Sequence, residues 1–230
     1  MATKTVTPKA ERKPADPARV KAILDVLEKT YPGVVCALHH RNAWELTVAT
    51  ILSAQCTDVR VNMVTPFLFK QFPTPKAMAA ASLHEIEDLI RTTGFFRNKA
   101  KSIKGAAKVV VEEFGGQVPQ TMEEILRLPG VARKTGNVVL GSWHGIASGV
   151  VVDTHVMRLS RRLEFTKEKT PEKVEKALMK IIPQDRWINF SHELIHHGRQ
   201  ICLARKPKCV DCTLEKLCFS GDKTWSSQPE

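Results

Sequence analysis

The most informative stretch of the chain is Ile125-Leu126-Arg127-Leu128-Pro129-Gly130-Val131-Ala132-Arg133-Lys134-Thr135-Gly136-Asn137-Val138. One helix is expected to end at Leu128, Pro129-Gly130 forms a tight turn, and a second helix begins near Ala132. Such a turn presents backbone N–H groups at a helix N-terminus, where the partial positive charge attracts an anion. The pattern predicts a helix-hairpin-helix that holds one backbone phosphate through main-chain groups and reads no base sequence.

Lys134 falls in the first turn of the second helix of this hairpin. The positive end of the helix dipole disfavours a protonated lysine, and a lysine must be neutral to attack as an amine. The position therefore suits a nucleophile. This stretch alone leaves open an ordinary surface lysine that grips phosphate.

Further along, the apolar run Val150-Val151-Val152 delivers Asp153 to the start of another helix. Asp is a common N-cap, so a purely structural role is one interpretation. A carboxylate opposite the nucleophile would also stabilise positive charge on a sugar and relay protons while a glycosidic bond breaks. Asp153 is compatible with both roles, whereas His155, two residues later, is expected to be structural.

Helical signals run through almost all of the remaining sequence. A short helix is expected after Thr121, and caps, first-turn prolines and apolar spacing predict longer ones over 18–30, 43–53, 57–72, 82–94, 98–114, 132–143, 154–163, 171–182 and 185–201. The β-branched run 150–152 is too short and isolated to build a sheet. The predicted fold class is all-α, with about ten helices and short connections.

The composition limits the classes of function. Hydrophobic residues make up 43% and charged residues 26% of the 230 residues, as in soluble globular proteins, and no apolar run is long enough to span a membrane. The net charge of +11 favours a polyanion such as nucleic acid, although a solvated basic surface is the alternative. Residues 1–15 lack an apolar signal core and are expected to form a disordered basic arm.

Four of the six cysteines crowd together near the C-terminus as Cys202-x6-Cys209-x2-Cys212-x5-Cys218. Without a secretion signal, a metal site in a reducing compartment is a better interpretation than disulfides. Zinc sites commonly use two C-x(2–4)-C knuckles, and only one occurs here, so the spacing favours a 4Fe–4S cluster over zinc.

The loop between the first two of these cysteines is basic. It contains Arg205, Lys206 and Lys208, and a bound metal would hold it rigid and project these side chains towards phosphates. The alternative is that the metal site is purely structural and that the charged side chains of this loop are only solvated.

These elements, in this order and spacing, resemble the endonuclease III family of helix-hairpin-helix DNA glycosylases, from about residue 16 to 219. The block Ile51-Leu52-Ser53-Ala54-Gln55-Cys56-Thr57-Asp58 is also similar to that family, with Cys56 where alanine is usual. The hairpin departs once, because Ala132 replaces the second glycine of Leu-Pro-Gly-x-Gly. This change is expected to weaken the phosphate contact slightly if that position needs a close backbone approach.

The resemblance implies two helical domains with a DNA-binding cleft between them. One is a six-helix barrel over 36–146, and the other joins 16–35 to 147–230 and carries the 4Fe–4S cluster. Lys134 and Asp153 would be catalytic at the mouth of this cleft. The resemblance also implies a monomer in a bacterial cytoplasm, associated with the nucleoid.

The implied activity is excision of oxidised or ring-saturated pyrimidines from double-stranded DNA, followed by β-elimination at the abasic site through a lysine Schiff base. By position, Gln55 resembles the residue that fills the gap left by the flipped nucleotide, and Phe95 the apolar wedge. The hairpin residues Leu128, Gly130 and Ala132 would contact the DNA backbone.

Two other functions are compatible with parts of this pattern. An adenine-mismatch glycosylase shares the hairpin, the Asp and the cluster, but it has no lysine at position 134 and usually carries a further C-terminal domain, whereas this sequence ends soon after Cys218. A non-catalytic DNA-binding module would use only the hairpin and the basic loop. It would not explain why Lys134 and Asp153 are both present. Cleavage of abasic DNA without magnesium distinguishes a lysine mechanism from such a module.

Overall fold

The computed structural model describes residues 15–224, and within that range it contains helices and no β-strand. The predicted arm over 1–15 lies, except for its last residue, outside the described residues. The α-helices are, in chain order, α1 (Pro17–Thr30), α2 (Ala43–Leu52), α3 (Asp58–Gln71), α4 (Pro75–Ala80), α5 (Leu83–Ile90), α6 (Phe96–Glu113), α7 (Met122–Ile125), α8 (Arg133–Ser142), α9 (Thr154–Arg162), α10 (Pro171–Ile181) and α11 (Trp187–Gln200). Short 3-10 helices are η1 (Arg91–Thr93), η2 (Gln184–Arg186), η3 (Cys209–Asp211) and η4 (Glu215–Leu217).

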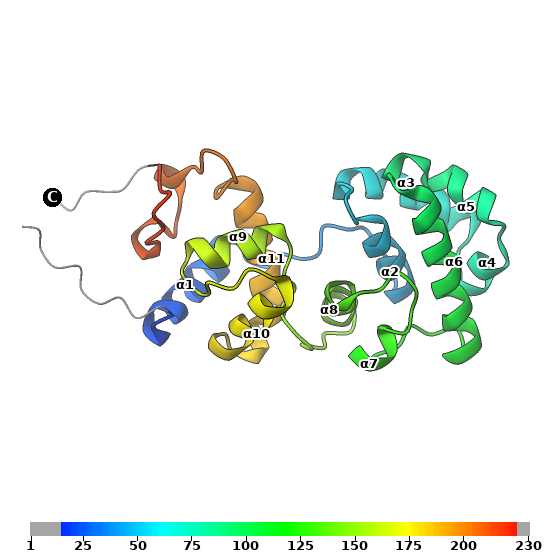
Figure 1. The fold of residues 1–230 in the computed structure, drawn as a ribbon, viewed down its shortest axis with the longest axis horizontal. Helices are drawn as coiled ribbons and strands as arrows, with labels where there is room; N and C mark the ends of the chain where they lie inside the picture. The colour runs from blue at the N-terminus through cyan, green and yellow to red at the C-terminus, as the bar shows by residue number, and fades with distance from the viewer. Residues whose placement is uncertain (1–14, 225–230) are drawn as a thin grey trace, which may run out of the picture.

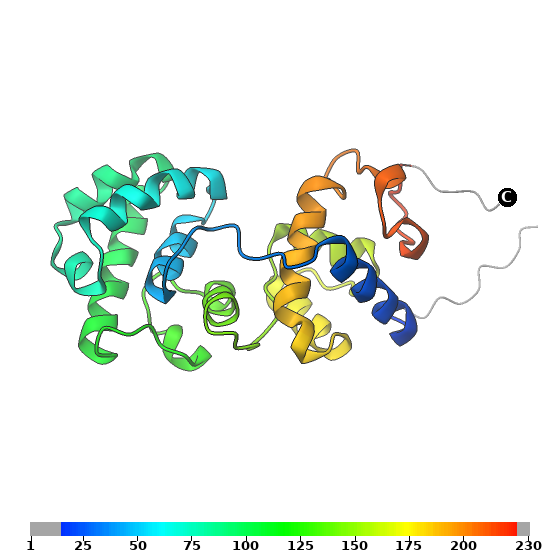
Figure 2. The same cartoon turned by 180° about the vertical axis from the view of Figure 1, so that it is seen from behind.

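The helices form two lobes that lie side by side (Figure 1). Apolar side chains of α2 to α8 make one core, and those of α1 and α9 to α11 make the other. Helix α1 therefore packs with helices from the far end of the chain, and it contacts α11 and η4. The segments 31–42 and 143–153 connect the lobes (Figure 2). The prediction of an all-α fold with two helical domains is confirmed, whereas the exact domain limits at 36 and 147 stay a prediction.

The β-branched run before Asp153 is a connector between the two cores. Val150 and Val152 are buried in the core of α1 and α9 to α11, whereas Val151 is buried in the core of α2 to α8. In extended chain, successive side chains point in opposite directions. The run therefore anchors in both lobes at once, which fixes where α9 begins relative to α8.

The helix starts agree with the capping signals in the sequence. The side chains of Asp16, Asn42 and Asp153 cap α1, α2 and α9, and Ser82 with Glu85 forms the expected capping box at α5. No helix of residues 15–224 has the length and apolar character needed to cross a membrane.

Three local expectations differ from the structure. Helix α4 was not expected, although Thr74 caps it and Pro75 begins it. Helix α6 begins at Phe96 rather than Asn98. The first helix of the hairpin is a single turn that ends at Ile125, and turns continue the chain to Leu128, because the Leu128 N–H bonds the Ile125 carbonyl, 3.2 Å away.

Candidate functional site

Lys134 and Asp153 line the same pocket, which lies between the two lobes. Lys134 is the second residue of α8, in one lobe, and Asp153 immediately precedes α9, in the other. The Lys134 side chain is exposed and Asp153 is half-buried. An amine and a carboxyl group from distant parts of the chain thus line one pocket.

Close packing and a polar network hold α8 in place behind Lys134. A Cβ atom on Gly136 would lie 2.9 Å from the Met122 sulfur, so α8 approaches α7 too closely for a larger residue there. On the other side, Glu175 of α10 accepts hydrogen bonds from Arg133 Nε and Asn137 Nδ2, both at 2.7 Å. The Glu175 hydrogen bond raises the pKa of Arg133. Because Glu175 belongs to the other lobe, this network fixes Lys134 relative to α9 and α10.

Asp153 caps α9 while it faces the pocket. Its Oδ1 accepts a hydrogen bond from the Val156 N–H at 2.8 Å, so the structural role is present. His155 Nδ1 lies 3.2 Å from an Arg158 nitrogen, and burial lowers the pKa of His155 although the nearby Asp153 raises it. The structural role of His155 stays a prediction.

The pocket contains further residues that the sequence analysis did not select. Asp58 of α3 and Arg199 of α11 form an ion pair at 2.6 Å that joins the two lobes. Burial raises the pKa of Cys36, and burial together with His196 lowers the pKa of His192 to about 4. Cys36 and His192 thus share the pocket with Lys134 and Asp153, and burial disfavours the charged form of both. No local motif marks these residues, because they reach the pocket only through the packing of the lobes.

The hairpin turn has the geometry expected of an anion site. Gly130 has φ +81, and a Cβ atom there would lie 2.6 Å from Ser102 Cβ. Neither the Gly130 nor the Ala132 N–H has an acceptor among the described residues, so both are free for a phosphate. Leu128, in contrast, is 1% exposed and belongs to the core of α2 to α8, so its contact with DNA stays a prediction.

Ala132 does not disturb this turn. Its backbone is extended, with φ −97 and ψ 172, and its side chain is exposed. Any residue adopts this conformation, so the hairpin itself does not require a second glycine. A Cβ atom at this position would matter only through direct contact with the phosphate.

Gln55 and Phe95, the predicted gap-fillers, line another pocket that Gly130 also lines. Both have left-handed backbones, with φ 52 and φ 47, and Phe95 is 64% exposed. A left-handed backbone in a non-glycine residue costs energy and persists only where the surrounding structure holds it. The structure therefore brings the two predicted gap-fillers to the hairpin, although they are far apart in the sequence.

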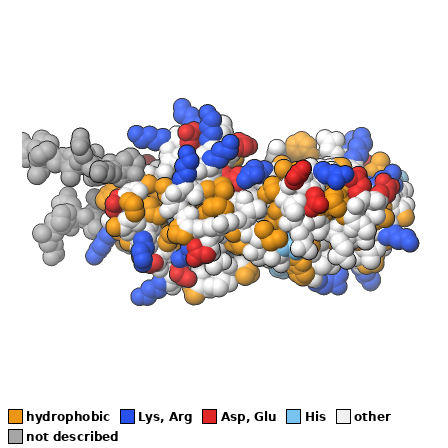
Figure 3. All heavy atoms as spheres, turned by 90° about the horizontal axis from the view of Figure 1, so that it is seen from below, with side chains coloured by type: hydrophobic (Ala, Val, Ile, Leu, Met, Phe, Trp, Pro, Cys, Tyr) orange, Lys and Arg blue, Asp and Glu red, His pale blue; other side chains and the backbone are white. Residues whose placement is uncertain are grey.

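The basic loop after α11 is exposed, as the sequence analysis expected. Arg205, Lys206 and Lys208 are all exposed and none forms an ion pair among the described residues. The net charge alone does not locate a site. On the face in Figure 3, basic side chains stand mainly around the rim of both lobes, with acidic ones among them.

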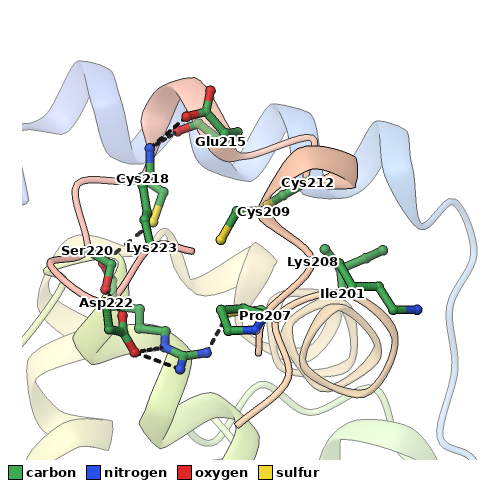
Figure 4. Close-up of a pocket in the computed structure, with 12 residues that line it drawn as sticks. Ile201, Pro207, Lys208, Cys209, Cys212, Glu215, Cys218, Ser220, Asp222 and Lys223 are labelled. Carbon is green, nitrogen blue, oxygen red and sulfur yellow. Dashed lines mark hydrogen bonds and ion pairs between the residues drawn. The ribbon is translucent and has the colours of Figure 1, made fainter. Parts of the chain in front are cut away.

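The four C-terminal cysteines line a single pocket of about 350 Å3. Figure 4 shows the sulfurs of Cys209 and Cys218 pointing into the space between them. The four thiols also act on one another: burial and the charges of the other three raise the pKa of Cys212 to about 11. None of the four forms a disulfide.

The donor set suits thiolate ligands of a metal cluster. Arg162 Nη1 donates to the Cys202 sulfur at 3.2 Å, and such an N–H donor stabilises negative sulfur. His197 Nε2 lies 3.4 Å from the Cys212 sulfur. A single zinc ion would draw its four sulfurs within about 4 Å of each other, given a bond length of about 2.3 Å. Among residues 15–224, no three His, Cys, Asp or Glu side chains are grouped closely enough to hold one metal ion.

Comparisons with known proteins agree with this geometry. The family model for HhH-GPD superfamily base excision DNA repair proteins matches residues 48–184, a span that includes the hairpin, Lys134 and Asp153. The fold and site thus define a helix-hairpin-helix protein of base excision DNA repair.

The relatives identify the family within this class. Endonuclease III of Synechocystis sp. is 58% identical over 203 residues, 88% of this chain and 93% of its own, and that of Bacillus subtilis is 42% identical over 206 residues, 89% and 94% of the two chains. A solved structure of a trapped endonuclease III–DNA covalent intermediate has a TM-score of 0.84 at 42% identity, covering 89% of this chain and 96% of its own. The chain belongs to the endonuclease III family. It is a DNA glycosylase and abasic-site lyase of base excision repair.

Proposed function

We propose that Lys134 is the nucleophile of both reactions and that Asp153 assists it. The observation that supports this assignment is their placement in one pocket between the lobes, although they come from α8 and from the start of α9. Lys134 is exposed there, so its amine can reach a nucleotide swung out of the duplex.

In the first step the neutral Lys134 amine attacks the sugar carbon that bears the damaged base. The bond to the base breaks, and the base leaves with the electron pair and takes up a proton. Asp153 stabilises the positive charge on the sugar and transfers protons during this departure. The sugar ring opens and the nitrogen remains bound to the carbon as a Schiff base.

In the second step the Schiff base acidifies the neighbouring sugar proton. Loss of that proton expels the 3′ phosphate by β-elimination, and the strand is nicked. Hydrolysis of the remaining imine returns the free lysine. This chemistry needs no metal ion at the scissile bond.

The substrates we propose are oxidised or ring-saturated pyrimidines and abasic sites in double-stranded DNA. DNA would lie across the cleft between the lobes, with the amides of Gly130 and Ala132 on one phosphate and Gln55 and Phe95 in the gap left by the flipped nucleotide. Arg205, Lys206 and Lys208 would bind further phosphates.

Cys202, Cys209, Cys212 and Cys218 would hold a 4Fe–4S cluster, which gathers the short helices η3 and η4 and stiffens the basic loop. No chemical step passes through this group. We further propose domain limits at 36 and 147, a monomeric state, and a place of action at the nucleoid in a bacterial cytoplasm.

The test is strand cleavage of a duplex with one preformed abasic site, in EDTA without magnesium. The parent should nick this DNA. Lys134→Gln should not nick it but should still bind it, whereas Lys108→Gln, which changes an exposed lysine on α6, should behave like the parent. A normal nick by Lys134→Gln would remove Lys134 from the mechanism.

Asp153→Asn tests the second residue. Asn also caps helices, so this variant should fold and melt close to the parent. We expect it to lose most base excision, because an amide does not stabilise the cationic sugar or carry a proton. Near-normal turnover would make Asp153 a helix cap alone.

A further inference from the structure

A buried lysine on α6 joins the ends of the two segments that precede the predicted gap-fillers. Lys99 is 6% exposed, and its Nζ donates to the Leu52 carbonyl at 2.8 Å and to the Thr93 carbonyl at 2.7 Å. Leu52 is the last residue of α2 and Thr93 the last of η1. Gln55 lies shortly after Leu52 in the sequence, and Phe95 lies shortly after Thr93.

Both of these loops need support from outside themselves. Gln55 and Phe95 have left-handed backbones, which non-glycine residues keep only when the surroundings hold them. The helix ends supply carbonyl groups without intrahelical partners, and a buried carbonyl needs a donor. One ammonium, with three N–H donors, satisfies a carbonyl from each segment and so sets the distance between them.

An ordinary surface lysine would not be found in this arrangement. Burial lowers the pKa of Lys99, because a buried ammonium loses its hydration. The two carbonyl groups that accept its hydrogen bonds offset part of this desolvation penalty. Lys99 also lines the pocket shared by Gln55, Phe95 and Gly130. It therefore lies directly behind the surface that we assign to the unstacked DNA.

We propose that Lys99 is a positioning residue that fixes the Gln55 and Phe95 loops relative to each other, so that both enter the DNA stack together. This proposal rests on the proposed function, in which these side chains occupy the gap left by the flipped nucleotide. Lys99 touches neither the reacting atoms nor the nucleophile. Its effect should appear only in the step that unstacks a paired base.

The experiment compares two substrates under single-turnover conditions with saturating enzyme. One duplex carries a damaged pyrimidine opposite a normal base, and the other carries a preformed abasic site. Because unstacking has a cost that the gap-fillers offset, Lys99→Met should slow excision of the paired base by about tenfold or more and change the abasic nick by less than about twofold. Lys99→Arg, which keeps N–H donors, should recover most of the loss.

A second comparison shows whether Lys99 acts through Phe95. Phe95→Ala should also slow excision of the paired base. Because residues that act as a unit are not additive, Lys99→Met combined with Phe95→Ala should excise the paired base at most about twofold more slowly than Phe95→Ala alone. Lys108→Met is the matched control on the same helix and should match the parent.

Equal losses on both substrates, or fully additive losses in the double variant, would overturn the proposal and leave Lys99 as a general structural residue. A flatter salt dependence of binding in Lys99→Met would also overturn it, because Lys99 would then bind phosphate directly. Should Lys99→Met not fold, Lys99→Gln carries the same comparison. Failure of the parent to nick abasic DNA would instead refute the proposed function, so the two failures are distinguishable.

Discussion

Gly130→Ala should test how the hairpin turn is held. The glycine has φ +81, and an added Cβ atom would meet Ser102 Cβ at 2.6 Å, Ser102 Oγ at 3.0 Å and Ile51 Cγ2 at 3.6 Å. The substitution therefore has two costs. One is the left-handed backbone, and the other is a clash with a helix that cannot give way easily.

The two costs can be estimated separately. A left-handed non-glycine residue costs about 1–2 kcal/mol, and the clash of this exposed position with half-buried Ser102 adds at most the about 1–3 kcal/mol of an overpacked core. We expect Gly130→Ala to lose at most about 2–5 kcal/mol of unfolding free energy, the sum of these terms. Gly145 has φ +68 with nothing within 4 Å of an added Cβ atom, so Gly145→Ala should show the backbone cost alone.

Urea unfolding at equilibrium measures these differences. Ser102→Gly removes the atom that clashes, so Gly130→Ala should be less costly in that background than in Ser102→Ala, where the Cβ atom remains. Binding of abasic DNA should weaken in Gly130→Ala, because the turn that presents the amides moves. A loss in Gly130→Ala no larger than in Gly145→Ala, or no coupling to position 102, would refute this account of the turn.

Three more predictions concern other parts of the molecule. The double variant Lys206→Ala with Lys208→Ala should flatten the slope of log binding constant against log salt concentration by roughly two units, because each phosphate contact contributes roughly one unit. Single-turnover cleavage should stay intact. An unchanged slope would show that the loop does not touch DNA. The pKa of His192 is lowered from 6.5 to about 4 in the folded protein, so as the pH falls His192 is protonated in the unfolded chain before it is protonated in the folded one. The free energy of unfolding should therefore decrease as the pH falls from about 6.5 to about 4. Replacing His192 with Gln should reduce that loss in urea titrations across this pH range, and an identical pH dependence would contradict the assignment. Anaerobically purified protein should be yellow-brown with about four irons per chain, whereas one zinc and no iron would rule out the cluster.

The features that sequence alone could predict are local ones. Caps such as Asp16, Ser82 and Asp153 act over a single turn, so their side chains already determine where α1, α5 and α9 begin. The Pro129-Gly130 turn is equally local, because it depends on one left-handed residue. Helix α4 also had a local signal, in Thr74 and Pro75, which the sequence analysis did not use.

The features that sequence alone could not predict depend on contacts between distant segments. Glu175 holds Arg133 and Asn137 across the two lobes, and Asp58 pairs with Arg199 over a gap of 141 positions. In the sequence, nothing distinguishes Lys99 from the other lysines of an amphipathic helix. Its role becomes visible only from its hydrogen bonds to the ends of α2 and η1. The placement of Gln55 and Phe95 came from the family resemblance, and no periodicity in the chain indicates that they share a pocket.

The most direct test of the central claim is borohydride trapping on abasic DNA, followed by peptide mapping of the adduct. Reduction of the Schiff base fixes the DNA to whichever amine attacked. The account predicts one covalent adduct, located at Lys134 and lost in Lys134→Gln, while Lys108→Gln forms it normally. An adduct that maps to another lysine, or that persists in Lys134→Gln, would contradict the assignment of Lys134 as the nucleophile.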